Sequence, residues 1–291
     1  MNSSIIMNLN TDILYPFIRQ ALAEDLGNGD HTSLSTIPAG QQGKAKLLIK
    51  DTGIIAGVSV AIEILKIVDP SLIPHVLIED GRAVRPGDIA FYINGSVHSI
   101  LIAERLVLNV MQRMSGIATT TNTVVKILQD TNTKVLDTRK TTPGFRYLEK
   151  LAVKIGGGVN HRFGLYDMIL IKDNHVDYAG GTARAIEAAK KYIQHNNLHI
   201  PLEIEVRNLV ELNEVINSGG VDRILLDNFT FEKLKEAVTL INKRFITEAS
   251  GGITENNVLE YAQCGVDYVS MGALTHSVRS LDMSLKAVRS N

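Results

Sequence analysis

The sequence has few cysteines and little net charge. Its 291 residues include one cysteine, Cys264, so the chain can form no disulfide within itself, and a reducing, cytoplasmic setting fits best. Cys264 lies between a helix-like and a strand-like segment, which favours a small buried apolar residue over a nucleophile. The formal net charge of −1 argues against non-specific nucleic-acid binding, which requires a broad basic surface.

Long hydrophobic runs are also lacking. The run at 54–62, IIAGVSVAI, is too short to span a bilayer and is followed by Glu63 and Lys66. The N-terminal residues, MNSSIIMNLN, lack the cationic start and the long apolar core of a signal peptide. We therefore expect a soluble, unprocessed protein that does not enter a membrane.

From about Val135 onward, short apolar runs that end in polar residues alternate with helical stretches. The runs are VLD (135–137), MILIKD (168–173), LEIEV (202–206), RILLDN (223–228), ITEASGG (246–252) and YVSMGA (268–273). Repeated βα units with apolar strands predict a parallel sheet covered by helices. No dinucleotide-binding fingerprint follows the first run, which favours a closed or nearly closed α/β barrel over a doubly wound sheet.

The first third of the sequence has a different pattern. Strands are expected over 45–57, 75–80 and 88–95, and helices over 58–68 and from near Ser99 to a break at Ser115-Gly116. These elements predict a small N-terminal α+β domain at 1–116, followed by a barrel domain at 117–275.

The C-terminal segment has apolar residues at helical spacing. Val278, Leu281, Leu285 and Val288 share one helical face. We therefore expect a helix over 276–291 that packs back on the N-terminal domain.

Positive charge is concentrated in residues 135–175. This segment has seven Lys and Arg against four Asp and Glu, a balance of +3 in a chain of net charge −1. Arg139, Lys140, Arg162 and Lys172 flank predicted strand ends, where a barrel gathers its reactive groups. The segment therefore predicts a pocket for a small polyanion. His161 fits equally well as a donor to that anion or as a histidine satisfied in the core.

The last two strands end in small residues, Ser250-Gly251-Gly252 and Met271-Gly272-Ala273. Such loops let backbone N–H groups approach an anion closely, and barrels often bind phosphate at this place. Ordinary βα turns also contain glycine, but two such loops on consecutive strands favour a phosphate site.

Glu205 and Asp227 come near the ends of two other strands, and Glu248 precedes the end of the strand at 246–252. Carboxylates beside a phosphate site suggest Mg²⁺ held jointly by protein and substrate. The alternative is that they neutralise neighbouring cations, and this alternative is strong for Glu248. Glu203 is expected to point away from Glu205.

Two further features have competing interpretations. Lys172 could form a Schiff base, but Asp173 and the many anion-binding groups nearby argue against the lowered pKa that this chemistry requires. Arg105, Asn109 and Gln112 share a helix face, which either meets solvent or lines a pocket in this subunit or in a partner.

Taken together, these segments resemble the quinolinate phosphoribosyltransferases of NAD biosynthesis. The matching motifs are ALAEDLGNGDHTS (21–33), ERLVLNVMQRMSGIAT (104–119), LDTRKTTPGFR (136–146), GGGVNHRFGLYDMILIKDNH (156–175), EIEV (203–206), ILLDNF (224–229), SGGIT (250–254) and GVDYVSMGALTHS (265–277). They cover most of the chain in order. One departure is Arg207 after EIEV, where the family often has an acidic residue.

The resemblance implies a type II phosphoribosyltransferase with an N-terminal α+β open-sandwich domain and an incomplete α/β barrel. It also implies a cytoplasmic, obligate homodimer whose active sites lie between the barrel of one subunit and the N-terminal domain of the other. It leaves open whether such dimers assemble into a hexamer.

The resemblance also implies roles for individual residues. Arg139, His161, Arg162 and Lys172 would surround the pyridine dicarboxylate, with Arg105 supplied by the partner subunit. The residues implied to bind phosphoribosyl pyrophosphate and its Mg²⁺ are Thr138, Lys140, Glu205, Asp227, Ser250, Gly251, Gly252, Met271, Gly272 and Ala273. Of these, Lys140, Glu205 and Asp227 would be catalytic, with Mg²⁺ bound to the two carboxylates directly or through water, together with the pyrophosphate.

The implied reaction joins quinolinate and phosphoribosyl pyrophosphate to give nicotinate mononucleotide, pyrophosphate and CO2. Three alternatives differ in chemistry. A related phosphoribosyltransferase would use another acceptor, a barrel aldolase would use Lys172, and a silent phosphate-binding protein would have no turnover. The acidic and basic residues at the strand ends argue against the last of these.

Overall fold

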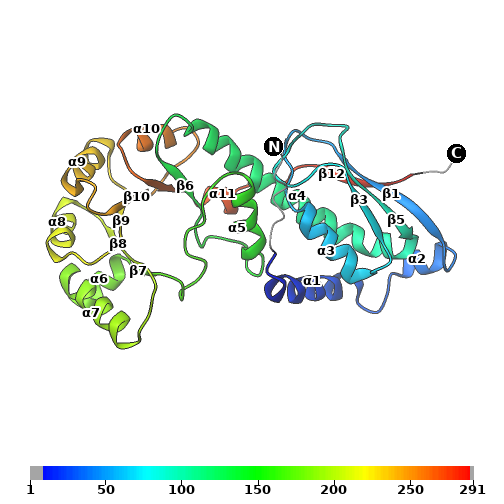
Figure 1. The fold of residues 1–291 in the computed structure, drawn as a ribbon, viewed down its shortest axis with the longest axis horizontal. Helices are drawn as coiled ribbons and strands as arrows, with labels where there is room; N and C mark the ends of the chain where they lie inside the picture. The colour runs from blue at the N-terminus through cyan, green and yellow to red at the C-terminus, as the bar shows by residue number, and fades with distance from the viewer. Residues whose placement is uncertain (1–8, 289–291) are drawn as a thin grey trace. The chain divides into compact units, whose positions relative to one another are not determined.

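A computed structural model describes residues 9–288 of the chain, which form two compact units (Figure 1). The first unit contains the residues up to Thr120, Thr142–Gly156, and the residues from Ser277 onward. The second unit contains Thr121–Thr141 and Gly157–His276. The cationic segment 135–175 is therefore divided, because its central part belongs to the first unit.

The first unit is built on a four-stranded antiparallel sheet in the order β12-β1-β5-β3. Its strands are β1 (Gln42–Ile49), β3 (Ile73–Val76), β5 (Ile89–Ser96) and β12 (Met283–Ala287), and β2 (Gly53–Ile54) pairs separately with β4 (Ala83–Val84). Ala45, Leu47 and Ile49 alternate with more exposed residues along β1. This period of two places one face of the sheet in the core.

Helices complete the first unit. They are α1 (Thr11–Leu26), α2 (His31–Thr36), α3 (Val58–Val68), α5 (Arg146–Ile155) and most of α4 (Val97–Ile127). The predicted helix over 58–68 is confirmed by α3, whose residues Val60, Ile64 and Leu65 are buried. Helix α1 was not predicted. It begins after the N-cap Asn10, whose side chain accepts a hydrogen bond from the N–H of Asp12.

The predicted break at Ser115-Gly116 is wrong, because α4 is continuous through both residues. The hydroxyl of Ser115 accepts the N–H of Ala56 at 2.8 Å and donates to its carbonyl oxygen at 3.1 Å. A Cβ atom at Gly116 would collide with the carbonyl oxygen of Arg279. These residues therefore allow two other segments to approach the helix closely.

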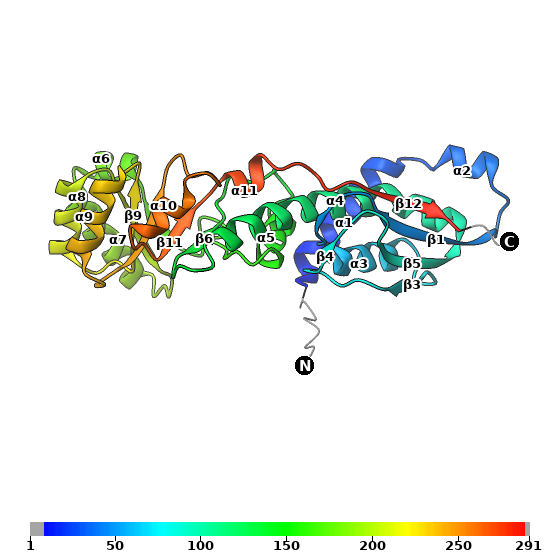
Figure 2. The same ribbon diagram turned by 90° about the horizontal axis from the view of Figure 1, so that it is seen from above.

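The predicted C-terminal helix over 276–291 is also wrong. The structure has the strand β12 at Met283–Ala287, and residues 289–291 lie outside the described part of the chain. β12 pairs antiparallel with β1, with Met283 opposite Ile49 and Leu285 opposite Leu47. Figure 2 shows the two strands side by side. The backbone groups of β1 thus gain partners that a helix could not supply.

The second unit contains a six-stranded parallel sheet in the order β6-β11-β10-β9-β8-β7. Because β6 and β7 are its edges, the barrel is incomplete, as predicted. The strands are β6 (Lys134–Leu136), β7 (Ile169–Ile171), β8 (Leu202–Val206), β9 (Arg223–Asp227), β10 (Ile246–Ser250) and β11 (Tyr268–Ser270). Because the strands are parallel, their carboxyl ends all lie at the same end of the sheet.

Helices lie around the outside of this sheet (Figure 1). They are α6 (Asp173–Ala179), α7 (Thr182–His195), α8 (Leu209–Ser218), α9 (Phe231–Ile241), α10 (Val258–Gln263) and α11 (Ala273–His276). Helix α8 begins after Asn208, whose side chain accepts the N–H groups of Val210 and Glu211, so this helix starts directly beyond the carboxyl end of β8. Among residues 9–288, no helix is both long enough and apolar enough to cross a membrane.

Candidate active site

A cavity of about 820 Å³ lies at the carboxyl ends of the parallel strands of the second unit. The residues predicted from the sequence that line this cavity are Thr138, Arg139, Lys140, His161, Arg162, Lys172, Glu205, Asp227, Glu248, Ser250, Gly251, Gly252, Gly272 and Ala273. The second unit alone therefore brings together most of the residues that the sequence marked.

Two predicted residues do not line this cavity. Met271 is buried, and its N–H donates to the carbonyl oxygen of Leu136 at 3.0 Å, so it pairs the end of one strand with the next. Arg105 lies on α4 within the first unit. Its predicted role through a partner subunit stays a prediction.

Arg139 and Arg162 supply the cationic side of the cavity. An Nη1 group of Arg162 donates to the carbonyl oxygen of Met168 at 3.3 Å. Burial, and after it the nearby positive charge of Arg139, lower the pKa of Arg162. An anion between the two guanidinium groups would relieve both effects, since it would neutralise their repulsion and supply charge-assisted hydrogen bonds.

Carboxylates line the neighbouring strand ends. Oε2 of Glu205, at the end of β8, lies 3.5 Å from Nζ of Lys172. Burial raises the pKa of Glu205, the charge of Lys172 lowers it, and the negative charge of Asp227 raises it again, with a net rise. These two carboxylates therefore repel one another, and a cation beside them would be stabilised.

The side chain of Asp227 is held in place from two directions. The hydroxyl of Ser250 donates to its Oδ1 atom, and the amide of Asn228 donates to its Oδ2 atom at 2.6 Å. Asn228 itself has a left-handed backbone, with φ of 55°. This conformation is uncommon outside glycine but is tolerated by asparagine.

Small residues bring the backbone close to the cavity. Gly251 has φ of +95°, and a Cβ atom there would collide with the side chain of Asn228. At Gly272 a Cβ atom would lie 3.0 Å from His276 and 3.1 Å from the side chain of Lys140. Gly251 therefore has no room for a larger residue and Gly272 has little, so both loops can present backbone N–H groups to an anion.

Lys140 is anchored through its backbone. Its N–H donates to the hydroxyl of Thr138 at 3.0 Å, and its carbonyl oxygen accepts from the hydroxyl of Thr275 at 2.8 Å. The residue as a whole is exposed at the cavity mouth. A fixed backbone with an accessible ammonium group suits a lysine that reaches a phosphate.

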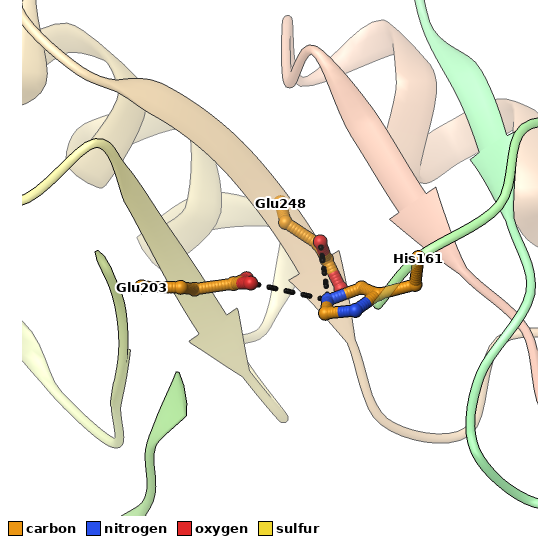
Figure 3. A group of neighbouring side chains, drawn as sticks. All are labelled: His161, Glu203 and Glu248. Atoms are coloured by element: carbon orange, nitrogen blue, oxygen red, sulfur yellow. Dashed lines mark ion pairs between the residues drawn. The ribbon is translucent and has the colours of Figure 1, made fainter. Parts of the chain in front are cut away.

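Below the cavity, a buried ionic cluster forms within the sheet. Nε2 of His161 lies 3.1 Å from Oε2 of Glu203 and 3.5 Å from Oε2 of Glu248, and Figure 3 shows both carboxylates pointing at this one nitrogen. Arg223 lies 2.8 Å from the same oxygen of Glu248. The expected neutralising role of Glu248 agrees with this contact.

The expected orientation of Glu203 is wrong. Glu203 and Glu205 are two residues apart on β8, so a strand places both side chains on the same face. Glu203 lies deeper along the strand and is fully buried against His161. The period of two along a strand was enough to predict that Glu203 and Glu205 share a face. The meeting of Glu203 with Glu248 could be seen only in the three-dimensional sheet.

The cluster shifts the acidity of its members. Burial and the charge of Glu248 raise the pKa of Glu203. Burial also opposes a charge on Glu248, but its contacts with His161 and Arg223 outweigh that cost and lower its pKa. Burial lowers the pKa of His161, whereas the contacts with both carboxylates raise it, with a net rise to about 9 if the ring is free to take a second proton.

Several cavity residues were not marked by the sequence. They are Leu170, Asp173, Leu225, Asn228, Ile253, Thr254, Ser270 and His276. A barrel gathers the residues that follow each strand, which would have signalled Asp173, Asn228 and Thr254. The approach of His276 to Gly272 depends on the short helix α11 and had no sequence signal.

Two family models match this chain. The model described as "Quinolinate phosphoribosyl transferase, N-terminal domain" matches residues 30–115, and the corresponding C-terminal domain model matches residues 117–286. Together they span most of the chain, including both the first sheet and the cavity residues.

Individual proteins agree with the family models. The chain is 46% identical over 284 residues to "Quinolinate phosphoribosyltransferase (decarboxylating) 1b" of Nicotiana tabacum, which covers 92% of this chain and 81% of that protein. It is 42% identical over 268 residues to "Probable nicotinate-nucleotide pyrophosphorylase (carboxylating)" of Bacillus subtilis, covering 92% and 91%.

Solved structures have the same fold. The nicotinate-nucleotide pyrophosphorylase of Francisella tularensis superposes with a TM-score of 0.90 at 39% identity, covering 99% of this chain and all of that chain. NadC of Streptococcus pyogenes superposes with a TM-score of 0.91 at 37% identity, covering 97% of this chain and all of the other.

Proposed function

Because this chain belongs to the quinolinate phosphoribosyltransferase family, we propose that the cavity at the carboxyl ends of β6–β11 is its active site. The chain is a phosphoribosyltransferase that converts quinolinate to nicotinate mononucleotide with loss of CO2, a step of NAD biosynthesis. The observation that supports this site best is that one cavity is lined both by cationic side chains and by carboxylates and glycine loops.

The cationic side would bind the pyridine dicarboxylate. Arg139 and Arg162 offer planar donors to carboxylates, and Lys172 adds a point charge that Glu205 only partly neutralises at 3.5 Å. A dianion placed here would stabilise the charged form of Arg162, whose pKa is lowered by burial. Leu170 contributes an apolar lining beside the ring.

The carboxylates and the glycine loops would bind phosphoribosyl pyrophosphate with Mg²⁺. The donor set fits this cation, because Glu205 and Asp227 are hard oxygen ligands whose negative charges Lys172 only partly offsets. When bound, Mg²⁺ would offset the negative charge of the pyrophosphate. The backbone of the loops at Gly251 and Gly272 would hold the phosphate groups.

The chain's own residues would then act by orientation and charge. The two ligands are fixed so that the pyridine nitrogen faces the anomeric carbon of the ribose, and pyrophosphate leaves as the new bond forms. Lys140 stabilises the charge that develops on the leaving pyrophosphate. The ring nitrogen has no proton to remove, so we assign no general base. The ring becomes cationic and stabilises the electron pair that is left on C2 when the 2-carboxylate leaves as CO2, and C2 then takes up a proton from water.

The experiment that tests this function measures pyrophosphate release with quinolinate and, separately, with nicotinate. Release that depends on quinolinate and on phosphoribosyl pyrophosphate is expected. A preference for nicotinate or another monocarboxylate would instead identify a related transferase with a different acceptor. Covalent trapping of Lys172 by borohydride in the presence of a carbonyl substrate would indicate an aldolase.

We also propose a cytoplasmic homodimer in which Arg105 of one subunit completes the site of the other. The location of Arg105 on α4, outside the cavity residues of the second unit, supports this assignment. Arg105→Ala should abolish activity, and a mixture with Asp227→Asn should be more active than either variant alone, through hybrid dimers. Lack of recovery in verified heterodimers would count against a shared site.

A further inference from the structure

The ring of His161 has contacts at both nitrogens. Nε2 faces the carboxylates of Glu203 and Glu248 at 3.1 and 3.5 Å, and Nδ1 accepts the backbone N–H of Arg162 at 2.7 Å. The backbone N–H of His161 donates to Asp137 at 2.9 Å. The imidazole side chain is only 7% exposed. The ring therefore lies between the buried cluster and the backbone of the cavity wall.

These contacts define where the ring proton lies. An atom that accepts an N–H bond cannot carry a proton itself, so Nδ1 is bare and the single proton is on Nε2. Nε2 lies 3.1 Å from Oε2 of Glu203 and 3.5 Å from Oε2 of Glu248, so the proton is directed toward these two carboxylates. From these contacts we assign His161 the neutral Nε2–H tautomer.

The cluster could hold either a metal ion or a proton, and this tautomer distinguishes between the two. Ligand-type atoms of His161, Glu203 and Glu248 lie within 4.8 Å of one another, a spacing that a metal ion could use. A metal on Nε2 would move the ring proton to Nδ1, where it would meet the N–H of Arg162. The nearby Arg223 already supplies a positive charge to the carboxylates. The arrangement therefore favours a proton over a metal.

The charged groups around the ring come from each element packed on it. Glu203 on β8 and Glu248 on β10 favour protonation of the ring. Arg223 on β9 weakens this effect, because it neutralises Glu248. Asp137, directly after β6, accepts the backbone N–H of His161. The N–H at Nδ1 opposes a second proton, because it stabilises only the neutral ring. The 2.7 Å contact therefore decides in favour of the neutral form over the doubly protonated one that the carboxylates alone would favour.

We propose that Glu203 and Glu248 are positioning residues that act through the ring of His161 on the backbone of its neighbour, Arg162. Both oxygens of Glu203 are buried without a hydrogen bond of ordinary geometry among the described residues, so its charge depends on this ring and on Arg223. The ring in turn fixes the chain at the point where the guanidinium group of Arg162 enters the cavity.

This inference rests on the proposed function only in that Arg162 is taken to bind quinolinate. His161 then contributes to binding indirectly, because its nitrogens are used by the protein. Removing the charge of Glu203 should loosen the ring, and the quinolinate site should lose affinity while the phosphoribosyl pyrophosphate site keeps it.

The first test requires no substrate. In full-length protein with ¹⁵N-labelled histidine, the chain's eight histidines are observed by NMR at pH 7.5, and His161→Gln assigns the signal. A protonated Nε2 and a bare, hydrogen-bonded Nδ1 are expected, and added Zn²⁺ should leave both unchanged. A doubly protonated ring, the other tautomer, or Zn²⁺ binding that Glu203→Gln abolishes would each overturn the inference, whatever the enzyme's acceptor is.

The second test is a double-mutant cycle on the KM for quinolinate. Glu203→Gln should raise it roughly tenfold, as for the loss of a hydrogen bond to a charged group, with kcat and the KM for phosphoribosyl pyrophosphate little changed. In an Arg162→Ala background the same change should add almost nothing, because both act on one contact. Additive effects, or an unchanged KM for quinolinate, would contradict an action of Glu203 through His161 on Arg162.

Two further variants complete this cycle. Asp222→Asn alters a carboxylate that binds the N–H of Leu202 at the opposite end of the sheet, and it should leave the KM for quinolinate unchanged. If Glu203→Gln does not fold, Glu248→Gln tests the same ring from β10. A Glu248→Gln protein with normal quinolinate binding and an altered His161 tautomer would break the link between the ring and Arg162.

Discussion

The two ends of the six-stranded parallel sheet use aspartate in opposite ways. At the amino ends, Asp222 accepts the N–H of Leu202 at 2.7 Å, and Asp267 accepts both the N–H and the hydroxyl of Thr247 at 2.8 Å. Each aspartate immediately precedes a strand and ties it to the start of its neighbour. At the carboxyl ends, Asp227 is held by side chains and faces a cavity.

This difference shows how one residue type serves two purposes on one sheet. A carboxylate that accepts backbone N–H groups stabilises the pairing of strands and uses part of its acceptor capacity there. A carboxylate that is oriented by side chains beside another carboxylate retains its charge for a ligand. The placement of Asp227 therefore trades local stability for binding capacity.

The largest expected effect comes from Asp227→Asn at the carboxyl end. The substitution removes the charge that, with Glu205, would attract Mg²⁺, and kcat should fall by about a hundredfold because several kcal/mol of charge stabilisation are lost. Steady-state kinetics over a range of Mg²⁺ concentrations measures this. A variant that keeps wild-type kcat and the same Mg²⁺ dependence would remove Asp227 from the site.

Arg162→Ala should have the next largest effect. Loss of its guanidinium group should weaken quinolinate binding by roughly 30-fold, the size expected for a charge-assisted contact, and leave phosphoribosyl pyrophosphate binding intact. Calorimetric titration with each ligand separates the two. Arg244→Ala is the matched control, since Arg244 binds the carbonyl oxygens of Leu240 and Ile241 beside the amino ends of the strands.

Gly251→Ala should have a smaller effect on both stability and binding. A left-handed backbone costs a non-glycine residue about 1–3 kcal/mol, and the new methyl group also collides with Asn228, which holds Asp227. Thermal unfolding and the Kd for phosphoribosyl pyrophosphate both report it. Gly252→Ala, with φ of +64° and open space, should lose less. Equal losses in the two variants would show that the collision does not matter.

The smallest effect is expected for Asp267→Ala at the amino end. Two hydrogen bonds to Thr247 are lost, and the free energy of unfolding should fall by about 1–2 kcal/mol. Both KM values should stay at their wild-type levels in an assay below the unfolding temperature. A change in either KM would mean that the two ends of the sheet are not independent.

Much of the site followed from the sequence because a parallel barrel brings the carboxyl ends of its strands to one edge. Lys172, Glu205 and Asp227 could be placed together for that reason alone. The cluster around His161 could not, since it depends on how far along β8 and β10 each glutamate lies. The spacing of residues in the sequence shows on which face of a strand a side chain lies. It does not show how far along that strand a side chain from another loop reaches.

The errors in the fold have a common physical origin. Ser115, Gly116 and the residues of β12 were interpreted from local propensity, whereas their conformation is set by partners far away in the sequence. A serine that binds the backbone of Ala56 does not need to end a helix. Apolar residues at helical spacing also form a strand when a sheet edge offers unpaired backbone groups.

The pairing of β12 with β1 has a consequence for how the chain is made. β1 leaves the ribosome early, but its partner is synthesised only after the whole second unit. Until then, β1 has an unpaired edge, and Gly53 lacks Leu281, whose side chain packs against it. The second unit has all its strands in one continuous stretch of synthesis and can complete its sheet first. We therefore expect the first unit to be translated first but to finish folding last. During synthesis it is the unit exposed to aggregation or to chaperones.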